Sequence, residues 1–101
     1  LADAQERMNA LCAANPNKAI FFSLLGYIDY QLSEYTVALQ HLQQALKLNA
    51  SDPLTNERMG DLQLALENKD EAVRYWKIAK SKGSTSPNLD QKINTRGAKP
   101  N

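Results

Sequence analysis

The stretch SLLGYIDYQLSEYTVALQHLQQALKLN, from Ser23 to Asn49, decides the fold. Its apolar residues follow helical spacing, yet Gly26 lies inside the first half. Glycine in a helix interior costs roughly 1 kcal/mol relative to alanine. A second helical stretch, Pro53 to Gly83, carries its own glycine, Gly60, 34 positions after the first. The matching glycines indicate an internal repeat, which has to be established before any other feature is interpreted.

The same spacing of 34 links other residues of similar size. The pairs are Ala38 and Ala72, Ala45 and Ala79, Leu42 and Trp76, Leu32 and Leu66, Leu25 and Met59, and Pro53 and Pro87. Because both small and large residues recur in register, the repeat extends over a whole pair of helices. A single helix pair cannot bury its apolar face alone, so we expect successive pairs to stack and complete one core.

The composition limits the function classes. The chain has 101 residues, enough for one small domain, with 43% apolar residues and a net charge of +1. This charge gives no support to nucleic-acid binding or to a polybasic membrane anchor. The longest apolar run, Ala19 to Gly26, is too short to span a membrane. Cys12 is the only cysteine, so no internal disulfide can form. The cysteine content therefore does not distinguish an oxidising from a reducing cellular compartment. Because the chain begins at Leu1, we expect a segment of a longer protein.

The pattern predicts six helices and no strand, because no segment alternates apolar and polar residues. The expected helices are Ala2–Ala14, Pro16–Leu32, a third ending at Leu48, Pro53–Glu67, a fifth ending at Ser81, and a short Pro87–Thr95. Thr36, Asp52 and Asp70 are the expected N-caps, and Gly83 is the expected C-cap.

The glycines then have a packing role. Gly26 lies on the first helix of a pair and Ala38 on the second, and Gly60 and Ala72 repeat this arrangement. Small residues facing each other let two helices approach closely, and the packing gained offsets the cost in helix propensity.

These residues resemble the tetratricopeptide repeat (TPR). A repeat starting at Ala19 supplies Phe22, Leu25, Gly26, Ala38, Leu42 and Ala45, and one starting at Pro53 supplies Met59, Gly60, Ala72, Trp76 and Ala79. The resemblance implies an all-α fold, an α-solenoid of stacked antiparallel helix hairpins. Residues 1–18 would form the second helix of a truncated repeat, 19–52 and 53–86 two complete repeats, 87–95 a capping helix and 96–101 a tail.

The sequence departs from the family pattern at core positions. Asn56 stands where a large apolar residue belongs, and Asp29 and Gln63 stand at an aromatic position. If Asn56 is buried, its amide needs hydrogen-bond partners.

Residues that could carry chemistry have simpler interpretations. His41 follows Gln40 on the outer face of a second helix, and we expect a solvated side chain with no partner for a base or ligand role. Cys12 has no basic neighbour and is expected to be a buried or half-buried, inert thiol. Trp76 falls on a core position of the repeat. No catalytic set, metal-ligand spacing or phosphate loop is present, so we expect no enzyme activity, no cofactor and no metal.

The resemblance implies a concave groove lined by the first helix of each repeat. The expected partner-binding residues are Ile20, Ser23, Tyr27, Tyr30, Leu54, Glu57, Asp61 and Leu64. Tyrosines on a rigid helix are good contact residues, although Tyr27 or Tyr30 could instead pack against a neighbouring helix.

The charges of this groove would select the partner. Chaperone-binding members of the family hold a terminal carboxylate with a lysine and an asparagine, whereas this chain has Ser23 with Tyr27 and Glu57 with Asp61 at those positions. The clamp is therefore absent. An acidic groove suits a partner that carries lysine or arginine.

Three hypotheses follow for the function. The leading one is a non-enzymatic adaptor or scaffold that binds a protein or peptide partner in the groove. The second is a structural module that stacks or self-associates through its open N-terminal end, where Met8, Leu11 and Cys12 would be exposed. The third is an accessory domain of an enzyme encoded elsewhere in a parent chain. The C-terminal stretch YWKIAKSKG, from Tyr75 to Gly83, resembles bacterial repeat proteins.

Overall fold

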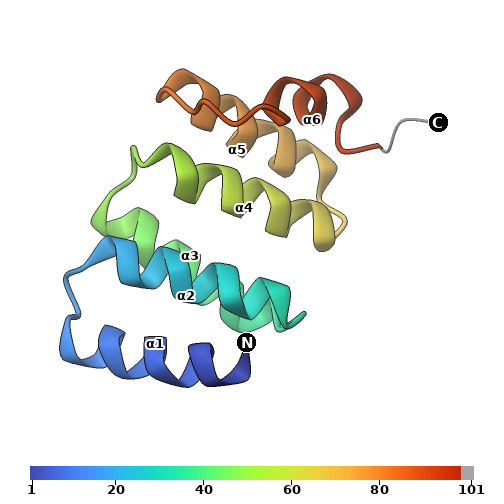
Figure 1. Cartoon of the computed structure of the whole chain (residues 1–101). Helices are drawn as coiled ribbons and strands as arrows, with labels where there is room; N and C mark the ends of the chain where they lie inside the picture. The colour runs from blue at the N-terminus through green and yellow to red at the C-terminus, as the bar shows by residue number, and fades with distance from the viewer. Residues whose placement is uncertain (99–101) are drawn as a thin grey trace. The chain divides into compact units, whose positions relative to one another are not determined.

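The computed structural model describes residues 1–98 and contains only helices in that range. They are α1 (Ala2–Ala14), α2 (Ala19–Gln31), α3 (Tyr35–Leu48), α4 (Pro53–Ala65), α5 (Lys69–Ser81) and α6 (Leu89–Thr95), shown in Figure 1. The all-α prediction is confirmed. The chain divides into two compact units, Leu1–Ala50 with the first three helices and Ser51–Asn101 with the last three.

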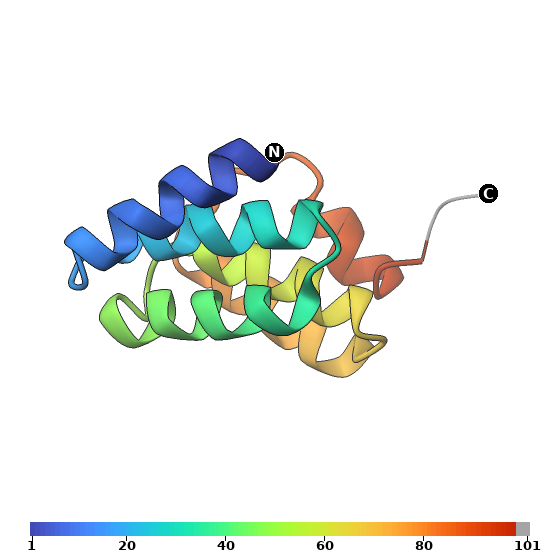
Figure 2. The same ribbon diagram turned by 90° about the horizontal axis from the view of Figure 1, so that it is seen from below.

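The first unit is a helix hairpin with a third helix added. A three-residue link joins α2 to α3, and α1 packs along α2 (Figures 1 and 2). The core between α1 and α2 contains Met8, Cys12, Leu25 and Ile28. The prediction that Met8 and Cys12 are exposed is therefore wrong. Both turn towards α2 and are 8% and 5% exposed, whereas Leu11 is 42% exposed as expected.

The Cys12 thiol is shielded by this packing. Burial raises the pKa of its thiol, and the nearby charge of Asp29 adds to the effect. Because the thiolate is the reactive form, this environment keeps the sulfur inert, as the sequence indicated.

The second unit repeats the hairpin with α4 and α5 and places α6 against α5. The indole of Trp76 is fully buried, as predicted from its repeat position. It belongs to a core cluster with Ala72, Val73 and Ala79, to which α6 contributes Leu89. A residue outside the two hairpins thus completes the core of this unit.

The helix starts follow the sequence signals only in part. Asp52 caps α4, because its carboxylate accepts a hydrogen bond from the Thr55 backbone N–H at 3.2 Å. The caps expected from Thr36 and Asp70 are wrong, since the N-caps of α3 and α5 lie two residues earlier in the chain and make no side-chain cap hydrogen bond. The predicted start of the second helix at Pro16 is also wrong. Residues 15–18 form a turn closed by a backbone hydrogen bond, so α2 begins at Ala19.

Both hairpin turns use the same backbone conformation. Ser33 after α2 and Glu67 after α4 have positive φ angles of 60° and 64°. The following N–H group donates back to the helix in each case, from Glu34 to Asp29 at 2.9 Å and from Asn68 to Gln63 at 2.8 Å. This is the bonding pattern of a Schellman motif, which satisfies carbonyl groups at a helix end. Gly83 has the same role after α5, with a φ of 98°.

The two helical glycines lie at close contacts within their hairpins. A Cβ atom on Gly26 would lie 2.6 Å from Leu42 Cγ and 3.3 Å from the Ala38 carbonyl oxygen. A Cβ atom on Gly60 would overlap the Trp76 indole and lie 3.1 Å from the carbonyl oxygen of Ala72. The close-approach interpretation is confirmed. The nearest obstacle is the large side chain one turn beyond the alanine.

The polar residue at an expected apolar position is accommodated locally. Asn56 is 2% exposed. Its amide donates to the carbonyl oxygen of Asp52 at 2.9 Å, one turn back in the chain. The amide therefore has the partner that its burial requires.

Candidate partner-binding surfaces

The first helix of the first hairpin, α2, presents two of its four expected contact residues to solvent. Ile20 is 70% exposed and Tyr27 is 40% exposed. They lie seven positions apart, two turns along the same side of α2. Tyr30 is half-buried, and its ring lies 5.9 Å from that of Tyr35 at the start of α3. Ser23 is 2% exposed and offers no contact area to a partner.

The first helix of the second unit presents fewer of its expected residues. Leu54 is 50% exposed at the start of α4. Leu64 is half-buried and packs against the core cluster around Trp76. Glu57 is only 8% exposed, because the loop before α6 and α6 itself cover it. Of the four expected residues on α4, Leu54 alone is freely accessible.

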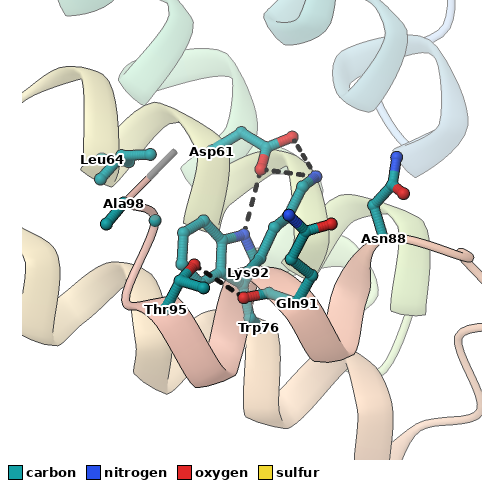
Figure 3. A pocket seen from close by; sticks show the side chains of 9 residues that line it. Asp61, Leu64, Trp76, Asn88, Gln91, Lys92, Thr95 and Ala98 are labelled. Atoms are coloured by element: carbon teal, nitrogen blue, oxygen red, sulfur yellow. Dashed lines mark hydrogen bonds and ion pairs between the residues drawn. The ribbon is translucent and has the colours of Figure 1, made fainter. Parts of the chain in front are cut away.

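The acidic pair on α4 is matched by a lysine of the same chain. The Lys92 ammonium group on α6 lies 3.0 Å from Glu57 Oε2 and 3.0 Å from Asp61 Oδ1. The Trp76 indole N–H also donates to Asp61 Oδ1, at 3.1 Å (Figure 3). The Ser86 hydroxyl donates to Glu57 Oε2 at 2.9 Å. The negative charge expected at the surface is therefore compensated within the unit.

Burial and pairing act differently on the two sides of this contact. Burial raises the pKa of the Asp61 carboxyl, against the lowering effects of Lys92 and Trp76. For Lys92, burial opposes the charged form, but the hydrogen bonds and charges of Asp61 and Glu57 outweigh it and raise its pKa. The raised pKa of Lys92 keeps its ammonium group charged at neutral pH, in agreement with its position between two carboxylates.

A pocket of about 260 Å³ lies beside this contact. Its lining comes from α4, α5, α6 and the residues after α6, with Asp61, Leu64 and Trp76 on one side and Gln91 and Lys92 on the other (Figure 3). The sequence did not predict that α6 supplies a lysine to the two carboxylates. The spacing of Leu89 and Ile93 indicated the apolar side of α6, but no pattern related Lys92 to carboxylates more than thirty positions earlier.

The expectation of a solvated His41 without a partner is wrong. Its Nδ1 atom donates to Oδ2 of Asp29 at 2.5 Å, and Asp29 is 1% exposed. The Gln5 amide donates to the other carboxylate oxygen at 2.8 Å. Asp29, which replaces the aromatic residue of the family pattern, thus connects α1, α2 and α3 through polar contacts.

A second apolar surface lies on α1 and α2. Leu1, Leu11 and Leu24 are 65%, 42% and 37% exposed. They border a shallow pocket of about 580 Å³, which the charged side chains of Asp3 and Arg7 also line. The sequence predicted an exposed surface at the N-terminal end with Met8, Leu11 and Cys12. In the structure Leu11 is exposed, whereas Met8 and Cys12 are buried.

Residues 1–98 contain neither a helix that could span a membrane nor a cluster of metal-ligating side chains. None of the helices described there is long and apolar enough to cross a membrane. The same range contains no group of three or more histidine, cysteine, aspartate or glutamate side chains that could hold a metal ion.

The fold is similar to that of solved type III secretion chaperones. PcrH in complex with the chaperone binding region of PopD superimposes with a TM-score of 0.77 at 24% identity, covering 95% of this chain and 72% of that one. The Yersinia enterocolitica chaperone SycD, in complex with a peptide of the translocator YopD, gives 0.81 at 18% identity, covering 95% and 76%. SycD as an alternative dimer gives 0.81 at 18% identity, covering 95% and 75%. At these identities the likeness shows a TPR-like helical fold. The sequence matches no protein-family model and no curated protein.

Proposed function

We propose that this chain is a non-enzymatic, peptide-binding module of the tetratricopeptide-repeat type that holds a segment of a partner protein. The observation that carries the proposal is the exposure of Ile20 and Tyr27 on α2 and of Leu54 on α4, three apolar side chains at expected contact positions. Such side chains on rigid helices lose little conformational freedom when a partner covers them. PcrH and SycD, which share the fold, are described with bound partner segments.

The proposed partner is a segment of a protein that a chaperone of this kind accompanies, as PopD and YopD are for PcrH and SycD. The proposed contact set is narrower than the sequence predicted. Ser23 and Glu57 are buried and Tyr30 packs against Tyr35, so the proposed contacts are Ile20 and Tyr27 in the first unit and Leu54 in the second. Glu57 and Asp61 are left out of this contact set, because Lys92 of the same chain forms ion pairs with both.

We expect Tyr27→Ala and Leu54→Ala each to weaken binding of a partner peptide about 5- to 30-fold, because each change removes an exposed apolar anchor. The peptide would be selected by display on the immobilised chain, and its dissociation constant measured by calorimetry. Micromolar values, roughly 8 kcal/mol, are expected for wild type.

The matched controls are Gln40→Ala on α3 and Lys77→Ala on α5, both exposed residues of second helices. If the controls weaken binding while Tyr27→Ala and Leu54→Ala leave it unchanged, the partner binds another face. Changing Glu57 and Asp61 to lysine is a poor test, since the new charges would repel Lys92 and disturb α6.

Self-association is the second candidate function, favoured by the exposed Leu1, Leu11 and Leu24 on α1 and α2. Exposed apolar patches of this kind often mark interaction sites, and a two-fold dimer would bury the same patch of both copies. We expect Leu11→Glu with Leu24→Glu to convert a dimer to a monomer in sedimentation equilibrium, whereas Gln43→Glu on α3 should leave it dimeric. A wild type that stays monomeric at the highest attainable concentration contradicts this candidate.

A further inference from the structure

We propose that α6 occupies a docking surface of the second unit that also fits an external helical segment carrying a basic residue, and that α6 competes with this segment. The inference rests on the proposed function and names the chemistry of one partner class. The surface, called the α6 seat below, consists of Glu57, Asp61 and Leu64 on α4 and Val73 and Trp76 on α5. Leu89, Ile93 and Lys92 of α6 lie against it.

Three side chains attach α6 to the rest of the unit. Leu89 is 2% exposed and joins the apolar cluster around Trp76, Ile93 packs against the same cluster, and Lys92 bridges the two carboxylates. The remaining ion pairs, Lys80 with Asp90 and Arg96 with Asp70, join side chains that are all more than half exposed. Exposed pairs of this kind contribute little to stability.

The helix itself adds little to this attachment. It has seven residues, and isolated helices of that length are not stable in water. Its structure therefore depends on docking. A segment held by few buried contacts belongs to the part of a protein that opens most easily.

The α6 seat selects for a positive charge. If α6 leaves, Glu57 and Asp61 lose the ammonium group between them, and Glu57 also loses the Ser86 hydroxyl. A carboxylate with little access to water is costly without a counter-charge, so any replacement has to supply a lysine or arginine.

The pattern of α6 describes the matching segment. An apolar residue, a basic residue three positions later and a second apolar residue one position further lie along one side of a helix, as Leu89, Lys92 and Ile93 do. The partner class is therefore an amphipathic helical segment with this spacing. Because α6 is tethered, its effective concentration is roughly millimolar, and a segment without further contacts cannot displace it at micromolar concentration.

The single tryptophan of the chain provides a direct readout. Trp76 is fully buried, donates to Asp61 and lines the α6 seat. The full chain with Lys92→Glu, which replaces attraction by repulsion, should undock α6 and shift the Trp76 emission to longer wavelength. The control is Lys77→Glu, the same charge change at an exposed position of α5, and it should leave the emission unchanged. Lys92→Arg should also keep the wild-type emission.

The probe is a synthetic peptide with the sequence of residues 84–98. It should bind the Lys92→Glu chain at least tenfold more tightly than wild type and restore the short-wavelength emission. The same peptide carrying Lys92→Glu should do neither. The proposal is overturned if Lys92→Glu leaves the emission unchanged, if the peptide fails to restore it, or if circular dichroism shows that the whole second unit unfolds. No outside partner enters this experiment, so its result is independent of the Tyr27→Ala and Leu54→Ala measurements.

Discussion

Gly26→Leu should lower the free energy of unfolding by about 1–3 kcal/mol or more, although leucine is the better helix former. A Cβ atom at this position would already lie 2.6 Å from Leu42 Cγ, and Leu42 is fully buried. The larger side chain has to separate α2 from α3 or force Leu42 out of its rotamer. Gly60→Leu should cost at least as much, because the obstacle there is the buried indole of Trp76.

Urea unfolding followed by circular dichroism measures both changes. Ala13→Leu, at an exposed position of α1, is the matched control, since it introduces the same side chain without a close neighbour helix. We expect the control to be within about 0.5 kcal/mol of wild type. A Gly26→Leu chain as stable as the control would show that the hairpin does not need the glycine.

His41→Ala should cost about 2–3 kcal/mol of unfolding free energy. The change leaves the Asp29 carboxylate, 1% exposed, with the hydrogen bond from the Gln5 amide. Removing a hydrogen-bond partner from a buried charged group costs roughly 1–3 kcal/mol or more. The cost should stay in this range because the His41 side chain is 23% exposed, so water can reach part of the vacated space.

A double change separates pairing from packing. Asp29→Leu combined with His41→Ala removes the buried carboxylate together with its hydrogen-bond partner, and replacing both partners of a buried hydrogen bond by apolar groups can be nearly neutral or stabilising. The double variant should therefore recover at least half of the stability lost in His41→Ala. Gln40→Ala, next to His41 and exposed, is the control. A double variant less stable than His41→Ala alone would contradict this account.

The helices and their contacts within each hairpin followed from the sequence because they depend on spacing. Gly26 with Ala38 and Gly60 with Ala72 recur in register, and the structure places both pairs at close helix contacts. Periodicity averages over several turns, so it locates a helix well. A helix end depends on a few local hydrogen bonds, which is why the start of α2 was misplaced by three residues.

The polar contacts were not predictable in the same way. The sequence marks Asp29 as a departure from the family pattern and predicts a solvated His41, but their meeting depends on how two helices rotate about their axes. Lys92 reaches Glu57 and Asp61 across more than thirty residues, through a loop whose path no spacing rule determines. The exposure of Ile20, Tyr27 and Leu54 agrees with the family register, whereas the burial of Glu57 depends on α6 and its loop.

The left-handed turns after α2 and α4 have a consequence for how the two repeats are compared. Ser33 and Glu67 occupy equivalent positions and share nearly the same φ angle, yet one side chain is a small hydroxyl and the other a long carboxylate. An alignment of residue types scores this position as a mismatch, although the backbone there is almost identical. What the two repeats have in common at this point is a torsion angle. A superposition of coordinates detects this similarity, whereas a comparison of residue types does not.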